Sequence, residues 1–77
     1  MPISLKILLE HQKKFGSNLK SLRLEKELSQ LDLAAMCNFE KTTISRIENG
    51  RTNITLKTVI ILAHALEIDL QTLFKEN

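Results

Sequence analysis

Several residue types that support other kinds of protein are scarce in this chain of 77 residues. Its single cysteine, Cys37, cannot form an internal disulfide, and no Cys/His cluster has the spacing of a metal site. Its two glycines do not make a glycine-rich phosphate loop, and no nucleophile, base and acid form a catalytic set. We therefore expect a protein that is not an enzyme and that needs no metal or cofactor.

Long hydrophobic runs are also missing. No segment has the roughly 18 apolar residues of a membrane span. Residues 1–9 are too short and too weakly basic for a signal peptide, so we expect no membrane association and a cytoplasmic location. Cys37 falls on an apolar helical face, which predicts a buried structural thiol rather than a reactive one.

The residues that are abundant indicate one small all-α domain. The chain is 43% hydrophobic and 26% charged, has no Trp or Tyr, and carries its one proline as Pro2. Leu, Lys, Glu, Ala and Ile dominate, and these residues are common in helices. A chain of this length buries a limited core, so dimerisation would help to stabilise it.

Four predicted helix starts share one pattern. In each, an apolar residue precedes the N-cap and a second one occupies the fourth helical position, which is a hydrophobic staple. Three of the four cap positions hold Ser, Thr or Asp, which are strong N-caps. The predicted caps and first helical residues are Ser29 and Gln30, Glu40 and Lys41, Thr55 and Leu56, and Asp69 and Leu70.

Other residues predict how these helices are closed. Asp32 lies three residues after the first cap, as in an acidic form of the capping box. Asn38 and Gly50 are placed to end helices in the left-handed conformation. Residues 56–66 are apolar around nearly the whole circumference, so we expect a central buried helix with His64 in the core or at an interface.

The amino-terminal third has helical periodicity. Apolar residues recur at three- and four-residue steps over residues 5–22, with one polar break at Gln12. Gly16 and its two polar neighbours weaken the middle, so a kink between two helices is one alternative, and a strand over Ile3–Leu9 is another. We expect the helix to end near Glu27.

The segment from residue 29 to residue 50 predicts two short helices joined by the three-residue turn 38–40. Few domains place two helices so close together, and the helix-turn-helix that reads DNA is one of them. On the second helix, Ile44, Ile47 and Glu48 should face inward. The outer face then carries polar side chains, of which Arg46 suits guanine and Thr42 a thymine methyl or a base edge. The predicted base-reading residues are Lys41, Thr42, Ser45 and Arg46.

Residues 15–74 resemble the phage repressor and Cro type of helix-turn-helix regulators, also called the xenobiotic response element family. The matching motifs are Leu22-Arg23, Leu28-Ser29-Gln30, Leu33-Ala34, Thr43-Ile44-Ser45-Arg46-Ile47-Glu48-Asn49-Gly50 and Leu62-Ala63-x-Ala65-Leu66. The resemblance implies a five-helix lambda-repressor-like domain at residues 15–77, whose third helix enters the major groove. Residues 1–14 precede it as a short apolar extension, predicted to be helical.

The resemblance also implies roles outside base readout. Arg23 and Glu48 would form a partly buried salt bridge between the first helix and the recognition helix. Asn38 stands where the family prefers glycine, and Glu40 replaces the usual Ser or Thr cap, which weakens the cap and adds negative charge near phosphates. The predicted phosphate ligands are Gln30, Thr43, Asn49, Arg51 and Asn53.

We therefore expect a bacterial or phage-encoded transcription regulator that binds double-stranded DNA in a sequence-specific manner and acts as a repressor. A homodimer would bind a palindromic operator with half-sites about 34 Å apart. The candidate dimer surfaces are the last helix (Leu70, Leu73, Phe74) and the segment Ile3–Leu9. The alternative is an antitoxin or adaptor of the same fold, with a protein partner docked on that segment.

Overall fold

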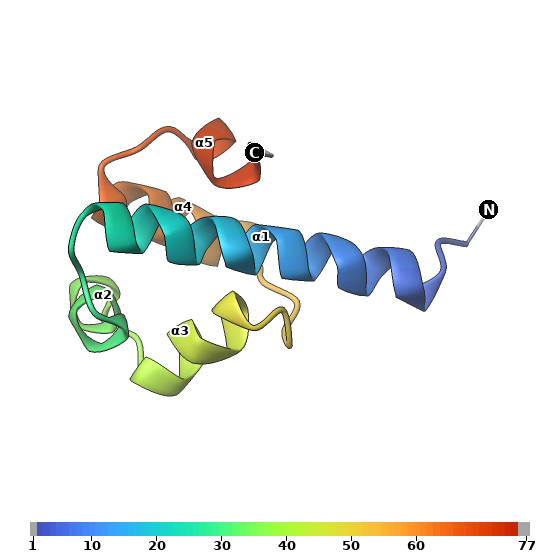
Figure 1. The fold of residues 1–77 in the computed structure, drawn as a ribbon, viewed down its shortest axis with the longest axis horizontal. Helices are drawn as coiled ribbons and strands as arrows, with labels where there is room; N and C mark the ends of the chain where they lie inside the picture. Colours follow the sequence, from blue (N-terminus) through green and yellow to red (C-terminus); the bar gives the residue numbers. More distant parts are fainter. Residues whose placement is uncertain (1, 76–77) are drawn as a thin grey trace.

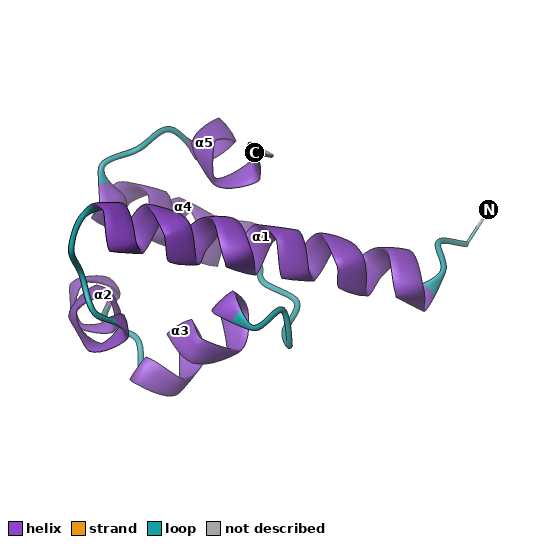
Figure 2. Cartoon of the chain, viewed as in Figure 1, coloured by secondary structure: helices purple, strands orange, loops and turns teal. Residues whose placement is uncertain are grey.

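The computed structural model describes residues 2–75, and over that range it contains five helices and no strand (Figures 1 and 2). The helices are α1 (Leu5–Glu25), α2 (Gln30–Cys37), α3 (Lys41–Glu48), α4 (Leu56–Leu66) and α5 (Leu70–Phe74). The all-α fold and the four predicted helix starts are therefore confirmed.

The core lies where the helices meet along the second half of α1. Helix α1 packs against α3 and α5, α2 packs against α3 and α4, and α4 packs against α5. The amino-terminal half of α1 projects beyond the other helices, to the right in Figure 1. The largest fully buried side chains are Leu19, Leu33, Ile44, Leu62, Leu66 and Leu73. Because Leu73 belongs to this core, its prediction as a dimer-surface residue is wrong.

Helix α1 is continuous for 21 residues, so the predicted alternatives of a kink and of a strand over Ile3–Leu9 are both wrong. Gly16 does not break the helix. Its lack of a side chain instead allows α1 and α3 to approach each other closely. A methyl group added there would lie 2.7 Å from the carbonyl oxygen of Glu48, at the end of α3. The helix ends at Glu25, earlier than predicted, and Glu27 takes a positive φ of 57° in the connection to α2.

The local signals at the helix ends were correct with one exception. Ser29 and Asp32 form the predicted capping box, and Asn38 and Gly50 adopt φ values of 58° and 69°. Asp69 is the N-cap of α5 as predicted, but it makes no side-chain capping hydrogen bond, so the strength predicted for this cap is wrong.

Helix α4 is less enclosed than its apolar sequence suggests. It buries Val59, Leu62 and other residues of one face, but Leu56, in its first turn, and Ile60 are exposed. His64 is exposed as well, so the first of its two predicted positions, the core, is wrong, and a position at an interface stays a prediction. Packing on one side therefore decides which apolar residues are covered. Cys37, by contrast, is buried as predicted, and burial raises the pKa of its thiol.

Candidate nucleic-acid interface

Helix α3 divides sharply into an inner and an outer face. Ile44, Ile47 and Glu48 are buried, and they fix the helix on α1 and α2. On the other side, Lys41, Thr42 and Arg46 are exposed, while Thr43 and Ser45 are half-buried at the margins. The structure thus brings the predicted base-reading side chains together on one helix with their functional groups available.

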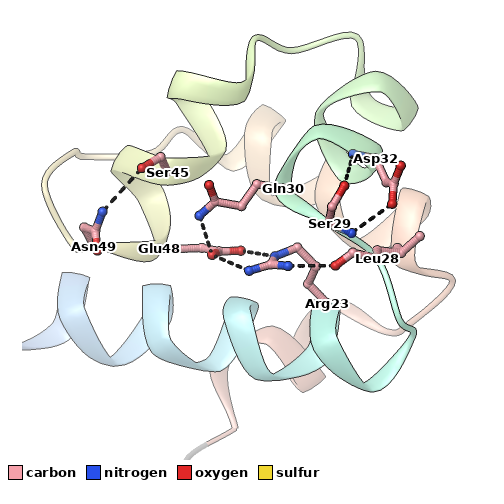
Figure 3. A network of polar contacts seen from close by, with 8 residues as sticks. All are labelled: Arg23, Leu28, Ser29, Gln30, Asp32, Ser45, Glu48 and Asn49. Carbon is pink, nitrogen blue, oxygen red and sulfur yellow. Dashed lines mark hydrogen bonds and ion pairs between the residues drawn. The ribbon is translucent and has the colours of Figure 1, made fainter.

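A buried ion pair anchors the end of α3. The guanidinium of Arg23, on α1, donates to both carboxylate oxygens of Glu48, at 2.7 Å from Nε to Oε2 and 3.0 Å from Nη2 to Oε1 (Figure 3). Nη1 donates to the carbonyl oxygen of Leu28 at 2.7 Å, which ties the approach to α2 into the same group. The hydrogen bond to Glu48 raises the pKa of Arg23. This network fixes three elements of the site relative to one another.

Gln30 joins this network, which the sequence did not predict. Its Nε2 donates to Oε1 of Glu48 at 3.0 Å, so the first residue of α2 is linked to the last residue of α3 (Figure 3). An amide nitrogen carries two hydrogens, so Gln30 keeps a second donor while the first is held by Glu48. The arrangement restricts the amide before any ligand arrives.

The start of α3 differs from its end. Glu40 occupies the N-cap position but makes no side-chain capping hydrogen bond, as predicted for a poor cap. Its carboxylate instead accepts a long hydrogen bond from Thr42 Oγ1, at 3.5 Å. The first turn of α3 therefore leaves its backbone donors without a side-chain cap and places a negative charge beside Lys41.

Of the other predicted phosphate ligands, Thr43 lies on α3, and Asn49, Arg51 and Asn53 lie in the connection between α3 and α4, residues 49–55. Asn49 Nδ2 donates to Ser45 Oγ at 3.4 Å, and Asn53 Oδ1 accepts from Gln12 Nε2 of α1. Arg51 is exposed. These residues follow the carboxyl end of α3, and Gln30, the first residue of α2, reaches the same end of α3 through its hydrogen bond to Glu48.

The arrangement of α2 and α3 was compared with known proteins. A family model described as helix-turn-helix matches residues 19–73. The chain belongs to the helix-turn-helix family. With the exposed polar face of α3, this membership identifies a DNA-binding transcription regulator.

Three known helix-turn-helix proteins illustrate the likeness. The control protein C.MunI of a Mycoplasma species is 41% identical over 64 residues, which are 82% of this chain and 86% of that protein. The ImmF control region 10 kDa protein of Bacillus phage phi105 is 38% identical over 61 residues, which are 79% and 68% of the two chains. The crystal structure of the restriction-modification controller protein C.AhdI from Aeromonas hydrophila matches with a TM-score of 0.80 at 36% identity, and covers 82% of this chain and 96% of that one.

Sequence reasoning missed two α1 residues that support the helix-turn-helix, Gln12 and Gly16. Both precede the family match. The only signal for Gln12 was that it interrupts an apolar helical stripe, and the only signal for Gly16 was its low helix propensity. Two negative findings apply to residues 2–75 alone. No helix there is long and apolar enough to cross a membrane, and no group of acidic, His or Cys residues there could hold a metal ion.

Proposed function

We propose that this helix-turn-helix regulator binds one double-stranded DNA sequence and represses transcription as a homodimer on a palindromic operator. The observation that carries the proposal is the division of α3 into an anchored inner face and an exposed polar outer face. An α-helix fits the major groove, and a helix fixed on its inner side presents its outer side chains at constant positions.

Base readout rests on the exposed residues of α3. Arg46 offers a planar pair of donors that matches O6 and N7 of guanine. Thr42 supplies a methyl group and a hydroxyl for a thymine or a base edge, and Lys41 reaches a guanine or a phosphate. Ser45 is half-buried and linked to Asn49, so its part in readout is the smallest of the four.

Phosphate contacts position the protein without reading the sequence. We assign these contacts to two places on either side of α3. Gln30 lies in the first turn of α2, where the helix dipole and the backbone donors favour an anion. The second place is the connection after α3 and the margin of that helix, with Thr43, Asn49, Arg51 and Asn53.

The homodimer would form on the side where α5 meets the projecting part of α1. Phe74 is 59% exposed, and Leu8 lines the same open cavity of about 810 Å³. Leu70 is exposed on α5. The two predicted dimer surfaces, the last helix and the segment Ile3–Leu9, therefore adjoin one cavity, and we propose that a second copy covers both.

An antitoxin or adaptor function is the second candidate. The observation that favours it is the exposure of Leu5, Ile7 and Leu9 on the part of α1 that projects from the fold. An apolar helical segment of this kind suits a protein partner. Salt-sensitive binding to a palindrome favours the regulator, whereas co-purification with a partner and no preference among duplexes favours the adaptor.

Selection of bound duplexes from a random pool tests the proposal, with wild type, Arg46→Ala and Arg51→Ala compared side by side. We expect a palindromic consensus for wild type and relaxed selection at one position per half-site for Arg46→Ala. Arg51→Ala is the control, because loss of a phosphate contact weakens all sequences about equally and leaves the consensus intact. Weak enrichment without a consensus would contradict sequence-specific binding.

A further inference from the structure

Residues 12–16 of α1 form a platform under the carboxyl end of α3 and the connection that follows it. Gln12 donates through Nε2 to Oδ1 of Asn53, which is 41 residues away in the sequence. A methyl group added at Gly50, which has a φ of 69°, would lie 2.7 Å from Cγ of Lys13. Together with the close approach of Gly16 to Glu48, these contacts place the connection directly on α1.

The hydrogen bond from Gln12 determines which way the Asn53 amide is turned. The acceptor oxygen and the donor nitrogen of an amide group are bonded to the same carbon, lie in one plane and point in different directions. Because Oδ1 accepts from Gln12, the donor Nδ2 points in a direction other than toward the Gln12 amide nitrogen. Nδ2 makes no hydrogen bond to any residue from 2 to 75, and the Asn53 side chain is exposed.

We propose that Gln12 is a positioning residue for DNA binding, which acts through Asn53 by holding its amide with Nδ2 toward a backbone phosphate. The inference rests on the proposed function, which assigns Asn53 to the phosphate backbone. A phosphate accepts hydrogen bonds and donates none, so only the observed orientation of the amide is productive. Gln12 precedes residues 19–73, so it is a feature of this chain beyond the matched part of the family.

A purely structural role for Gln12 would be to fasten the connection to α1, and the two roles separate in Gln12→Glu. The new carboxylate accepts hydrogen bonds but donates none. The pair then stays bonded only if Asn53 turns its amide and donates through Nδ2, which leaves Oδ1 toward the phosphate. Gln12→Glu thus keeps a hydrogen bond between α1 and Asn53 but reverses the Asn53 amide. Gln12→Met removes this hydrogen bond.

The first experiment measures binding to the selected duplex and to copies with one phosphate at a time replaced by a neutral methylphosphonate. The phosphate that Asn53 contacts is identified as the one whose replacement weakens DNA binding by wild type but not by Asn53→Ala. In the otherwise wild-type protein, we expect Gln12→Glu to weaken DNA binding about tenfold. In the Asn53→Ala background the same substitution should weaken binding only about twofold, because there the only effect is repulsion between the added carboxylate and the DNA. Gln12→Met should weaken binding about threefold and reduce the effect of replacing that phosphate. Equal costs of Gln12→Glu in both backgrounds would overturn the inference.

A second measurement needs no DNA, so it separates this inference from the proposed function. Nuclear magnetic resonance of the free protein follows solvent exchange of the Asn53 side-chain amide hydrogens. We expect fast exchange of both hydrogens in wild type and protection of one in Gln12→Glu, with both proteins folded. Protection in wild type would overturn the inference even if the operator is found. If the protein selects no preferred duplex, the proposed sequence-specific function is contradicted instead.

Discussion

Helices α2 and α3 have the same length, eight residues, but different interactions hold them in place. Helix α2 is capped by residues next to it in the sequence. Ser29 and Asp32 form a capping box at its start, and Asn38 ends it in the left-handed conformation. Helix α3 has no side-chain cap at its start, and its end depends on Arg23 and on the close approach of Gly16.

The difference fits the roles that we propose for the two helices. Under the proposed function, a DNA phosphate or base meets the backbone donors at the uncapped start of α3. The end of α3 is the part that must not move, because it carries the inner face that fixes the register of the outer one. Capping by neighbouring residues therefore suits a supporting helix, and anchoring by distant residues suits the helix that we propose reads the DNA.

The strongest test of this comparison removes the distant anchor. Glu48→Ala leaves the Arg23 guanidinium buried without its partner, since the two side chains are only 2% and 7% exposed. We expect a loss of about 3–5 kcal/mol in the free energy of unfolding, enough to unfold much of the protein rather than only weaken DNA binding. Thermal unfolding followed by circular dichroism measures it.

A double variant serves as the control for Glu48→Ala. Arg23→Met combined with Glu48→Leu leaves no unpaired charge, so it should recover most of the lost stability. A melting temperature of Glu48→Ala within about 2 °C of wild type would mean that the pair does not anchor α3.

The second test changes the spacing between α1 and α3. Gly16→Ala improves helix propensity by about 1 kcal/mol at an exposed site, but here the methyl group meets the carbonyl oxygens of Ile47 and Glu48. We expect a net loss of about 1–3 kcal/mol in chemical denaturation. The neighbouring exposed Ser17→Ala is the control and should be neutral or slightly stabilising. Stabilisation by Gly16→Ala would show that α1 and α3 separate at little cost.

The third test gives α3 the local closure that α2 already has. Glu40→Ser supplies a good N-cap and removes a negative charge near the DNA, so we expect a gain of about 1 kcal/mol, a higher melting temperature and tighter DNA binding. Asp69→Ser, at the start of α5, is the control, because it exchanges two N-cap residues of about equal strength and should leave the melting temperature and the DNA affinity nearly unchanged. Unchanged or weaker binding by Glu40→Ser would refute the expected effect on affinity.

The smallest effect concerns the closure of α2 and depends on pH. The Ser29 backbone N–H donates to Asp32 Oδ2 at 2.9 Å, and this bond lowers the pKa of Asp32. A carboxylate with a lowered pKa stabilises the fold above its unfolded pKa of about 3.9, and this stability is lost as pH falls through the folded pKa. Melting temperatures of wild type and Asp32→Ala should therefore differ at pH 7 and converge below about pH 4. A constant difference down to pH 2 would contradict the assignment.

Much of the fold could be predicted because its signals are local. The start of each helix from α2 to α5 was read from residues within one turn, and the structure has the same first residues. The failures lie elsewhere, in α1, which continues through Gly16 and ends at Glu25, and on the faces of other helices. Leu56 and Ile60 are as apolar as Leu62 but lie on the uncovered side of α4, and Leu73 lies on the covered side of α5.

The sequence by itself determined the starts of α2 to α5 and the helix-turn-helix, because capping and stapling join residues three to five positions apart. It also determined which side chains lie on the outer face of α3, since that follows from helical periodicity. Only the tertiary structure decided that Gln30 bonds to Glu48, 18 residues away, and that Gln12 bonds to Asn53, 41 residues away. Such contacts depend on how complete helices pack, and no short window of sequence contains both partners.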